Sequence, residues 1–247
     1  MSDRFSGLLL RRADDALVLG HRLSEWTGHA PSLEEELALA NLALDLIGQA
    51  RALYALAAER GTGEDEDALA YLRSDRDYRN LLLLELPNGD FAVTIARLFL
   101  YAAFADPFWR AASVSRDRDL AAIAAKAEKE CAYHLRHSAE WLIRLGDGTA
   151  ESHGRAQAAL DRLWPYTGEM FEAEDDVLVA ADITPEPAGL REAWERTVGA
   201  VLAEATLDRP VECWMQTGGR EGRHTEHLGH MLAVMQSVAR SFPDAKW

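Results

Sequence analysis

Apolar residues recur at helical spacing along most of the chain. One run consists of Leu42, Leu46, Gln49, Leu53 and Leu56, which follow one another at intervals of four, three, four and three residues. This spacing places all five on one face of an α-helix, the face that a helical bundle buries. Gln49 is the polar residue in this run, so we expect an amide inside the core.

A second run of this kind follows Arg116. Its members are Leu120, Ala124, Ala127, Cys131, His134, Ser138 and Leu145. The shared spacing predicts that Cys131 and His134 point inward together. Each of two long helices therefore carries polar side chains on its buried face.

Glycine and proline divide the chain into about eight helical stretches, and no long Ser/Gly-rich linker separates them. We therefore expect a single domain, residues 1–247. Ser32, three residues before Glu35, predicts a helix N-cap, Thr149 predicts another, and Thr184-Pro185 predicts a helix start. The expected helices cover residues 3–26, 32–61, 66–73, 75–86, 90–112 with a kink at Pro107, 116–145, a stretch from 149 interrupted at Pro165, a stretch from 184, and 222–240.

Composition supports an all-α fold. The chain has 42 Ala and 35 Leu but only 10 Val and 5 Ile, so strong helix formers outnumber β-branched apolar residues about five to one. Two of the expected helices approach thirty residues and are joined to their neighbours by short turns, which is typical of a long-helix bundle with additional shorter helices.

Charge and cysteine content narrow the function classes. The chain carries 26 Lys plus Arg against 41 Asp plus Glu, a net charge of −15, which disfavours partnership with nucleic acid or an anionic membrane. Cys131 and Cys213 lie far apart and form no short-spaced metal pair, which fits a reducing cytoplasm. No segment approaches the roughly 18 consecutive apolar residues of a membrane span. We expect a cytoplasmic protein.

Helical bundles that bind two metal ions supply a Glu from each of two helices and a Glu-x-x-His pair from each of the other two. The Glu-x-x-His pattern occurs once in this chain, at residues 221–224, within a glycine-rich turn that suits a rigid ligand pair poorly. The corresponding windows in the two long helices run from Leu46 to Gln49 and from Cys131 to His134. Both lack the carboxylate, and the first lacks the imidazole.

These windows carry a family resemblance. Residues 45–49 read Asp-Leu-Ile-Gly-Gln, residues 129–134 read Lys-Glu-Cys-Ala-Tyr-His, and residues 21–25 read His-Arg-Leu-Ser-Glu. They are similar to the motifs Asp-Glu-x-Gly-His, Lys-Glu-Glu-x-x-His and His-x-x-Ser-Glu of the catalytic A subunits of bacterial ring-1,2-phenylacetyl-CoA epoxidases. The chain as a whole resembles the C-subunit family of these complexes, the paralogues of the A subunits.

The resemblance implies a ferritin-like fold in which the six metal-ligand positions have degenerated. These positions are Glu25, Leu46, Gln49, Ala102, Cys131 and His134. Only Glu25 and His134 keep a ligand type, and the other four cannot supply a field of four carboxylates and two imidazoles. The resemblance thus implies no catalytic, cofactor-binding or metal-binding residue and no cofactor in this chain.

The implied role is that of a non-catalytic structural subunit in a multicomponent monooxygenase of phenylacetate degradation. That complex converts phenylacetyl-CoA to ring-1,2-epoxyphenylacetyl-CoA. The resemblance places the diiron centre in the A subunit, a flavin and an iron–sulfur cluster in the reductase, and a B subunit as a further partner in the hetero-oligomer.

Two other functions remain as alternatives: a metal-binding ferritin-like oxygenase with unusual ligands, and a stand-alone ferritin-like binding protein. The first would use His134 with Glu25, or the cluster of His224, His227 and His230. For that cluster the competing interpretation is a polar contact surface or a network at the start of a helix. Arg220 and Arg223, beside glycines, are candidates for contact with an anionic group of a partner.

Overall fold

The computed structural model describes residues 2–172, 176–211, 214–243 and 245; Cys213 lies outside the described residues. The described residues form helices and no strand, which confirms the all-α prediction. The chain divides into two compact units. The first unit is Met1–Pro87 with Thr217–Trp247, and the second unit is Asn88–Gln216. The expectation of a single domain over residues 1–247 stays a prediction.

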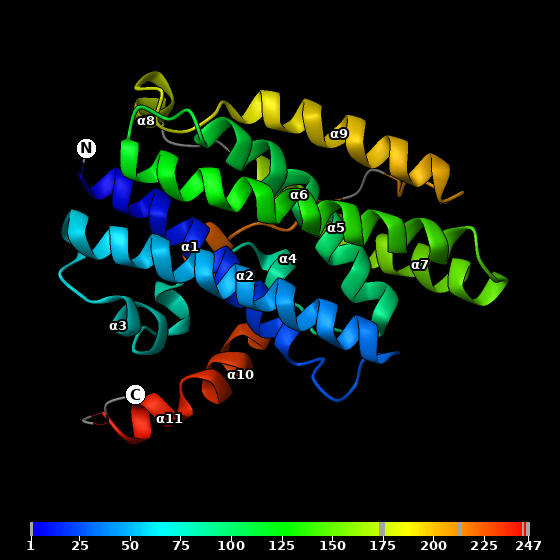
Figure 1. Cartoon of the computed structure of the whole chain (residues 1–247), viewed down its shortest axis with the longest axis horizontal. Helices are drawn as coiled ribbons and strands as arrows, with labels where there is room; N and C mark the ends of the chain where they lie inside the picture. The colour runs from blue at the N-terminus through cyan, green and yellow to red at the C-terminus, as the bar shows by residue number, and fades with distance from the viewer. Residues whose placement is uncertain (1, 173–175, 212–213, 244, 246–247) are drawn as a thin grey trace. The chain divides into compact units, whose positions relative to one another are not determined.

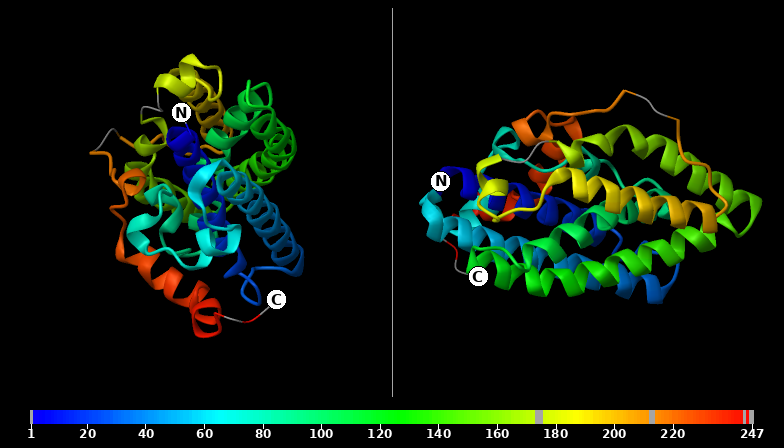
Figure 2. Two further views of the ribbon diagram at one scale, coloured as in Figure 1. Left: turned by 90° about the vertical axis from the view of Figure 1, so that its left-hand side faces the viewer. Right: turned by 90° about the horizontal axis from the view of Figure 1, so that it is seen from above.

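The first unit is built on two long helices, α1 (Ser2–Ser24) and α2 (Leu33–Ala57), which lie side by side (Figures 1 and 2). The Ser32 side chain accepts a hydrogen bond from the backbone N–H of Glu35, so the predicted N-cap is confirmed. The α-helix ends before Gly61, because the chain continues as a π-helical turn, η1 (Ala58–Thr62), in which Gly61 has a φ of 122°.

Short elements complete the first unit. They are α3 (Glu66–Tyr71), η2 (Asp75–Asp77), α4 (Leu82–Glu85), η5 (Gly219–Glu221), α10 (Glu226–Met235) and α11 (Ser237–Ser241). The prediction of one helix over residues 75–86 is wrong, since Tyr78 and Leu81 have extended backbone. The prediction of one helix over 222–240 is also wrong. The helix α10 begins only at Glu226, and Gln236 separates it from α11. The side-chain amide of Gln236 donates hydrogen bonds to the carbonyls of Ala70 and Arg73.

The second unit is centred on α5 (Phe91–Ala112), which packs against three other helices. These are α6 (Arg118–Gly146), α7 (Ala150–Leu163) and α9 (Pro187–Glu204); the shorter elements are η3 (Trp164–Tyr166), η4 (Gly168–Phe171) and α8 (Asp176–Ala180). Thr149 caps α7 as predicted. The helix expected to start at Thr184-Pro185 starts at Pro187 instead, with Pro187 in its first turn.

α5 is long and apolar enough to cross a membrane by length and composition. However, 89% of its most apolar 18-residue window is buried within the folded chain, which is the pattern of a core helix in a soluble protein. Aromatic side chains line this core: Trp194 of α9 packs against Trp164 and Phe171, with ring centroids 5.5 and 5.4 Å away. The Trp194 indole also donates a hydrogen bond to the Leu100 carbonyl of α5, at 2.9 Å.

Candidate functional site

Three of the six degenerate ligand positions lie in the first unit. Leu46 and Gln49 are buried on the same face of α2, as the spacing predicted. Glu25 lies just beyond the end of α1, where its side chain is 43% exposed and its carboxylate accepts a hydrogen bond from Arg22 at 2.8 Å. The one carboxylate among these three positions thus pairs with a neighbouring guanidinium.

The other three positions lie in the second unit. Ala102 is buried on α5, and Cys131 and His134 are buried together on α6, which confirms that they share the inward face. Cys131 forms no disulfide bond with any residue that the structure describes. The hydroxyl of Ser138, one turn beyond, donates to the His134 carbonyl at 2.7 Å. Leu142 continues this buried face, so the prediction of Leu145 for the last position was wrong.

The chemistry of these six side chains does not fit a two-metal centre. Leu46 and Ala102 offer no donor atom, Gln49 offers only a neutral amide, and one carboxylate and one imidazole remain where such a centre needs four and two. Across the part of the chain that the structure describes, no group of three or more His, Cys, Asp or Glu side chains is arranged to hold a metal ion. The buried side chains at these positions, Leu46, Gln49, Ala102, Cys131 and His134, therefore resemble those of an ordinary packed core.

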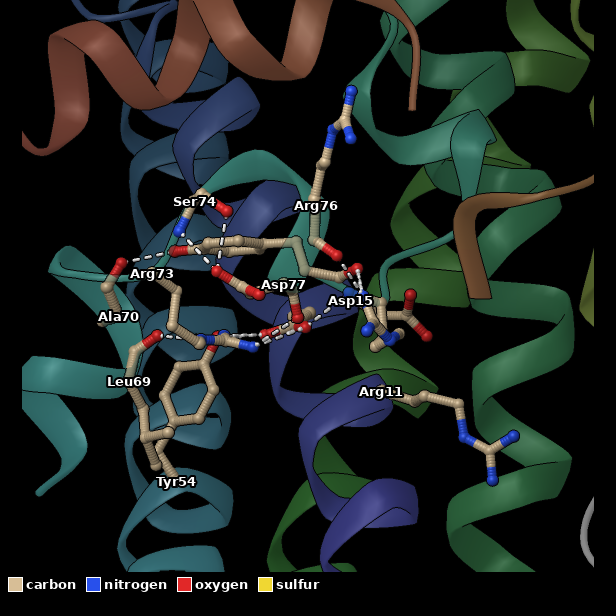
Figure 3. A network of polar contacts seen from close by, with 12 residues as sticks. Arg11, Asp15, Tyr54, Leu69, Ala70, Arg73, Ser74, Arg76 and Asp77 are labelled. Carbon is tan, nitrogen blue, oxygen red and sulfur yellow. Dashed lines mark hydrogen bonds and ion pairs between the residues drawn. The ribbon is translucent and has the colours of Figure 1, made fainter. Parts of the chain in front are cut away.

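A dense cluster of polar side chains lies elsewhere in the first unit. Two adjacent aspartates of α1 form its centre, and arginines from distant parts of the chain surround them. We call this cluster the ionic network; its members are Asp14, Asp15, Tyr54, Arg73, Arg79, Glu85, Arg220 and His224. Figure 3 shows part of it around Arg73 and Asp15.

Asp14 is fully buried and accepts hydrogen bonds from three residues. Its donors are the Tyr54 hydroxyl, the Arg73 guanidinium and the backbone N–H of Arg79, the last at 2.7 Å. Arg73 donates in addition to the Leu69 carbonyl (Figure 3) and lies over the ring of Tyr78, 4.3 Å from its centroid. Asp14 thereby joins α1, α2 and the segment after α3.

Asp15 binds the C-terminal segment of the unit. Its carboxylate accepts two hydrogen bonds from the Arg220 guanidinium, at 2.9 and 2.8 Å, and one from the Leu81 N–H at 2.9 Å. Arg220 donates also to the Arg79 carbonyl at 2.6 Å. Such bidentate charged contacts are among the strongest and most directional in proteins. Arg220 thus contacts a carboxylate of its own chain, and its contact with an anionic group of a partner stays a prediction.

Gly222 lets the C-terminal segment approach closely. It has a φ of 79°, and a Cβ at this position would lie 2.3 Å from the Arg76 carbonyl oxygen. A side chain is excluded both by the backbone conformation and by this contact. The glycine-rich turn at residues 218–222 therefore packs against the segment that follows α3.

Glu85 and His224 form a second buried pair in the network. Glu85 accepts from the Asn80 amide at 2.9 Å and from the Thr225 N–H at 2.6 Å, and its Oε2 lies 2.7 Å from His224 Nδ1. His224 Nε2 lies 3.0 Å from the Tyr78 carbonyl, which can only accept, so Nε2 carries a hydrogen. Nδ1 and Oε2 are joined by a hydrogen bond at 2.7 Å.

This geometry favours the helix-start network for the C-terminal histidine cluster, because Thr225 is the N-cap residue of α10. His227 contributes its backbone carbonyl, which accepts from Arg22 at 3.3 Å, and His230 is exposed. Arg223 is exposed and pairs with Glu221. Metal binding by the cluster of His224, His227 and His230 stays an untested alternative.

Burial and charge perturb the phenols and the guanidinium of the network. Burial raises the pKa of Tyr54 well above its ordinary value, and the neighbouring Asp14 carboxylate raises it further. The same two causes raise the pKa of Tyr78. Burial alone would lower the pKa of Arg73, but the charge and hydrogen bond of Asp14, together with Tyr54 and Tyr78, outweigh burial and raise the pKa. Both phenols therefore stay protonated and Arg73 stays charged at neutral pH.

Sequence reasoning missed this network. Its signal was available, because Asp14 and Asp15 interrupt an otherwise apolar face between Leu8 and Leu19, where two adjacent carboxylates need buried partners. The partners come from positions 40 to 205 residues further along the chain, so no local spacing identifies them. Chemically the network satisfies buried charge and ties chain segments together.

The chain is similar to known proteins over nearly its whole length. A protein family described as phenylacetic acid catabolic protein matches residues 2–247. The C subunit of the 1,2-phenylacetyl-CoA epoxidase of Escherichia coli (strain K12) is 49% identical over 247 residues, which cover 99% of this chain and 100% of that protein. The similarity therefore spans both units and the ionic network as well as the degenerate ligand positions.

Proposed function

Since this chain belongs to the phenylacetic acid catabolic protein family, we propose that it is the C subunit of a 1,2-phenylacetyl-CoA epoxidase. The resemblance drawn from the motifs and the expected ferritin-like fold are confirmed by this membership. The name of the relative implies that other subunits are its partners, because a C subunit is one part of a multi-subunit enzyme.

Within that complex we propose a non-catalytic, structural role. The observation that carries it is the chemistry of the six degenerate positions, where Leu46, Gln49, Ala102 and Cys131 replace the ligand types that a diiron centre needs. Their burial supports a role in core packing. The chain would bind and support the catalytic A subunit, which holds the diiron centre, and the B subunit and a flavin/iron–sulfur reductase would complete the complex.

A physical route to this role exists in paralogous assemblies. A surface that joins two identical bundles by twofold symmetry can join two diverged copies in a pseudo-symmetric pair. One copy then keeps the metal ligands, while the other conserves only its fold and its docking surface. The reaction supported in this way is the conversion of phenylacetyl-CoA to ring-1,2-epoxyphenylacetyl-CoA.

Co-expression with the A subunit tests the proposal. We expect the two chains to co-elute in size-exclusion chromatography, and oxygen consumption dependent on phenylacetyl-CoA to require this chain beside the A subunit, B subunit and reductase. Separate elution, with an A subunit equally soluble and active without this chain, would contradict the proposal.

Metal analysis separates the structural role from the oxygenase alternative. The chain is expressed alone with iron or manganese supplied, as wild type, as His134→Ala and as the control His29→Ala at an exposed histidine. We expect well below one metal ion per chain in all three. Near-stoichiometric metal that His134→Ala removes and His29→Ala retains would overturn the non-catalytic assignment.

A further inference from the structure

The outer face of α2 is unusually apolar for a solvent-facing helix surface. Leu33, Leu37 and Leu44 are 69%, 58% and 66% exposed. They lie opposite the buried face that carries Leu39 and Leu46. A helix that is apolar on two opposite faces is typical of one that is covered on both sides.

The exposed leucines form one continuous stripe. Leu33, Leu37, Ala40 and Leu44 follow one another at intervals of four, three and four residues, the spacing with which one helix packs along another. The stripe extends for roughly 17 Å along the helix, since each residue adds about 1.5 Å. We call these four residues the α2 stripe.

The outer face of α6, a helix of similar length, is charged, as is usual for a helix surface that faces solvent. Its exposed positions include Asp119, Lys126, Lys129, Arg136 and Glu140, which solvent hydrates readily. The α2 stripe has no charged member. Contiguous exposed apolar surface of this kind marks protein interaction sites more often than scattered leucines do.

Charge beside the stripe indicates what covers it. Glu34 and Glu36 lie in the first turn of α2 beside Leu33 and Leu37, and the chain as a whole carries a net charge of −15. A second copy of this chain would bring the same net charge of −15 to this face. A helix with an apolar stripe and flanking Lys or Arg would meet both the leucines and the glutamates.

We propose that the α2 stripe is the docking surface for such a helix, apolar and flanked by basic residues, of the catalytic A subunit. This inference rests on the proposed function and adds the surface and the chemistry of its partner. Leu37 in the middle of the stripe and Leu44 at its C-terminal end are its anchors, and Glu34 and Glu36 orient the partner.

The test compares co-expression of the A subunit with wild type, with Leu37→Asp/Leu44→Asp and with Leu72→Asp. Leu72 is a matched control, since it is 57% exposed at the end of α3, away from the stripe. All three side chains are exposed, so thermal melting of each variant alone should match wild type. We expect the double variant to bind the A subunit on the order of a hundredfold more weakly and the control to bind like wild type.

A further variant tests the charges. Glu34→Gln/Glu36→Gln should slow association with the A subunit and reduce the dependence of the association rate on salt concentration. Unchanged rates and salt dependence would overturn the basic-flank part of the inference.

The outcomes separate the inference from the proposed function. Wild-type binding of the A subunit by Leu37→Asp/Leu44→Asp would overturn the docking surface and leave the proposed function standing. Failure of wild type itself to bind would count against the proposed function. A wild-type homodimer that the double variant converts to monomers would show that a second copy covers the stripe, which also overturns the inference.

Discussion

The two units stabilise their helices by different means. In the first unit, buried carboxylates bind arginines, a histidine and backbone groups. Asp14 and Asp15 of α1 pair with Arg73 and Arg220, and Glu85 of α4 contacts His224. In the second unit, aromatic rings surround α5, with Trp194 at the centre of a cluster that includes Trp164 and Phe171.

The difference follows from how each unit is assembled. The second unit is one continuous segment of mostly long helices, which bury large apolar faces against α5. The first unit must bring residues 217–247 back to residues 1–87, and its short helices offer little apolar surface for this. Directional charged contacts specify the position of such a segment, because few other arrangements satisfy every buried group. Three experiments test this contrast.

The largest expected effect is that of Asp14→Ala. The substitution leaves the buried Arg73 guanidinium without its main carboxylate partner, and we expect the free energy of unfolding in urea to fall by about 3–5 kcal/mol. Hydrogen exchange measured by mass spectrometry should rise in the first unit and not in α5 or α9. The control Glu151→Ala removes an exposed pair with Arg155 and should cost less than about 1 kcal/mol.

A smaller effect is expected for Trp194→Phe in the second unit. This change removes the hydrogen bond to the Leu100 carbonyl and part of the ring volume, at a cost of about 1–3 kcal/mol in urea denaturation. Trp214→Phe, at an exposed tryptophan, should stay within about 0.5 kcal/mol of wild type. If Trp194→Phe destabilised the chain more than Asp14→Ala, the contrast between the units would fail.

The smallest effect concerns pH. Burial, and then the charge of Arg22, lower the pKa of His21 below its ordinary value of 6.5. The folded state therefore favours neutral His21: its stabilising contribution is present above pH 6.5 and is lost as pH falls through the lowered pKa. Thermal melting between pH 7.5 and 5 should decline less for His21→Gln than for wild type. If the melting temperatures of His21→Gln and wild type declined equally over this pH range, the titration of His21 would not be the cause of the decline.

Local signals predicted the regular helices well. The Ser32 and Thr149 caps, the buried stripe through Gln49 and the inward pair Cys131 and His134 all depend on spacing within one helix, and the structure confirms them. The family resemblance, together with the side chains found at Leu46 and Ala102, implied that the six ligand positions no longer supply a diiron donor set.

The elements around the ionic network could not be predicted in this way. Apolar periodicity suggested one helix over residues 75–86, but the backbone there is extended because Arg79 and Leu81 donate their N–H groups to Asp14 and Asp15. At these two positions a tertiary hydrogen bond takes the place of a helical one. At the end of α10 the side-chain amide of Gln236 donates to the carbonyls of Ala70 and Arg73, while its backbone N–H still donates to the Leu232 carbonyl.

The sequence by itself therefore determined the all-α class, the long helices and the identity of the residues at the degenerate positions, because these depend on composition and on neighbours within a few residues. Only the tertiary structure decided that Asp14 and Asp15 are buried with Arg73 and Arg220 and that the α2 stripe is exposed. Burial of charge and exposure of leucine depend on contacts between distant segments, and helical periodicity carries no information about those contacts.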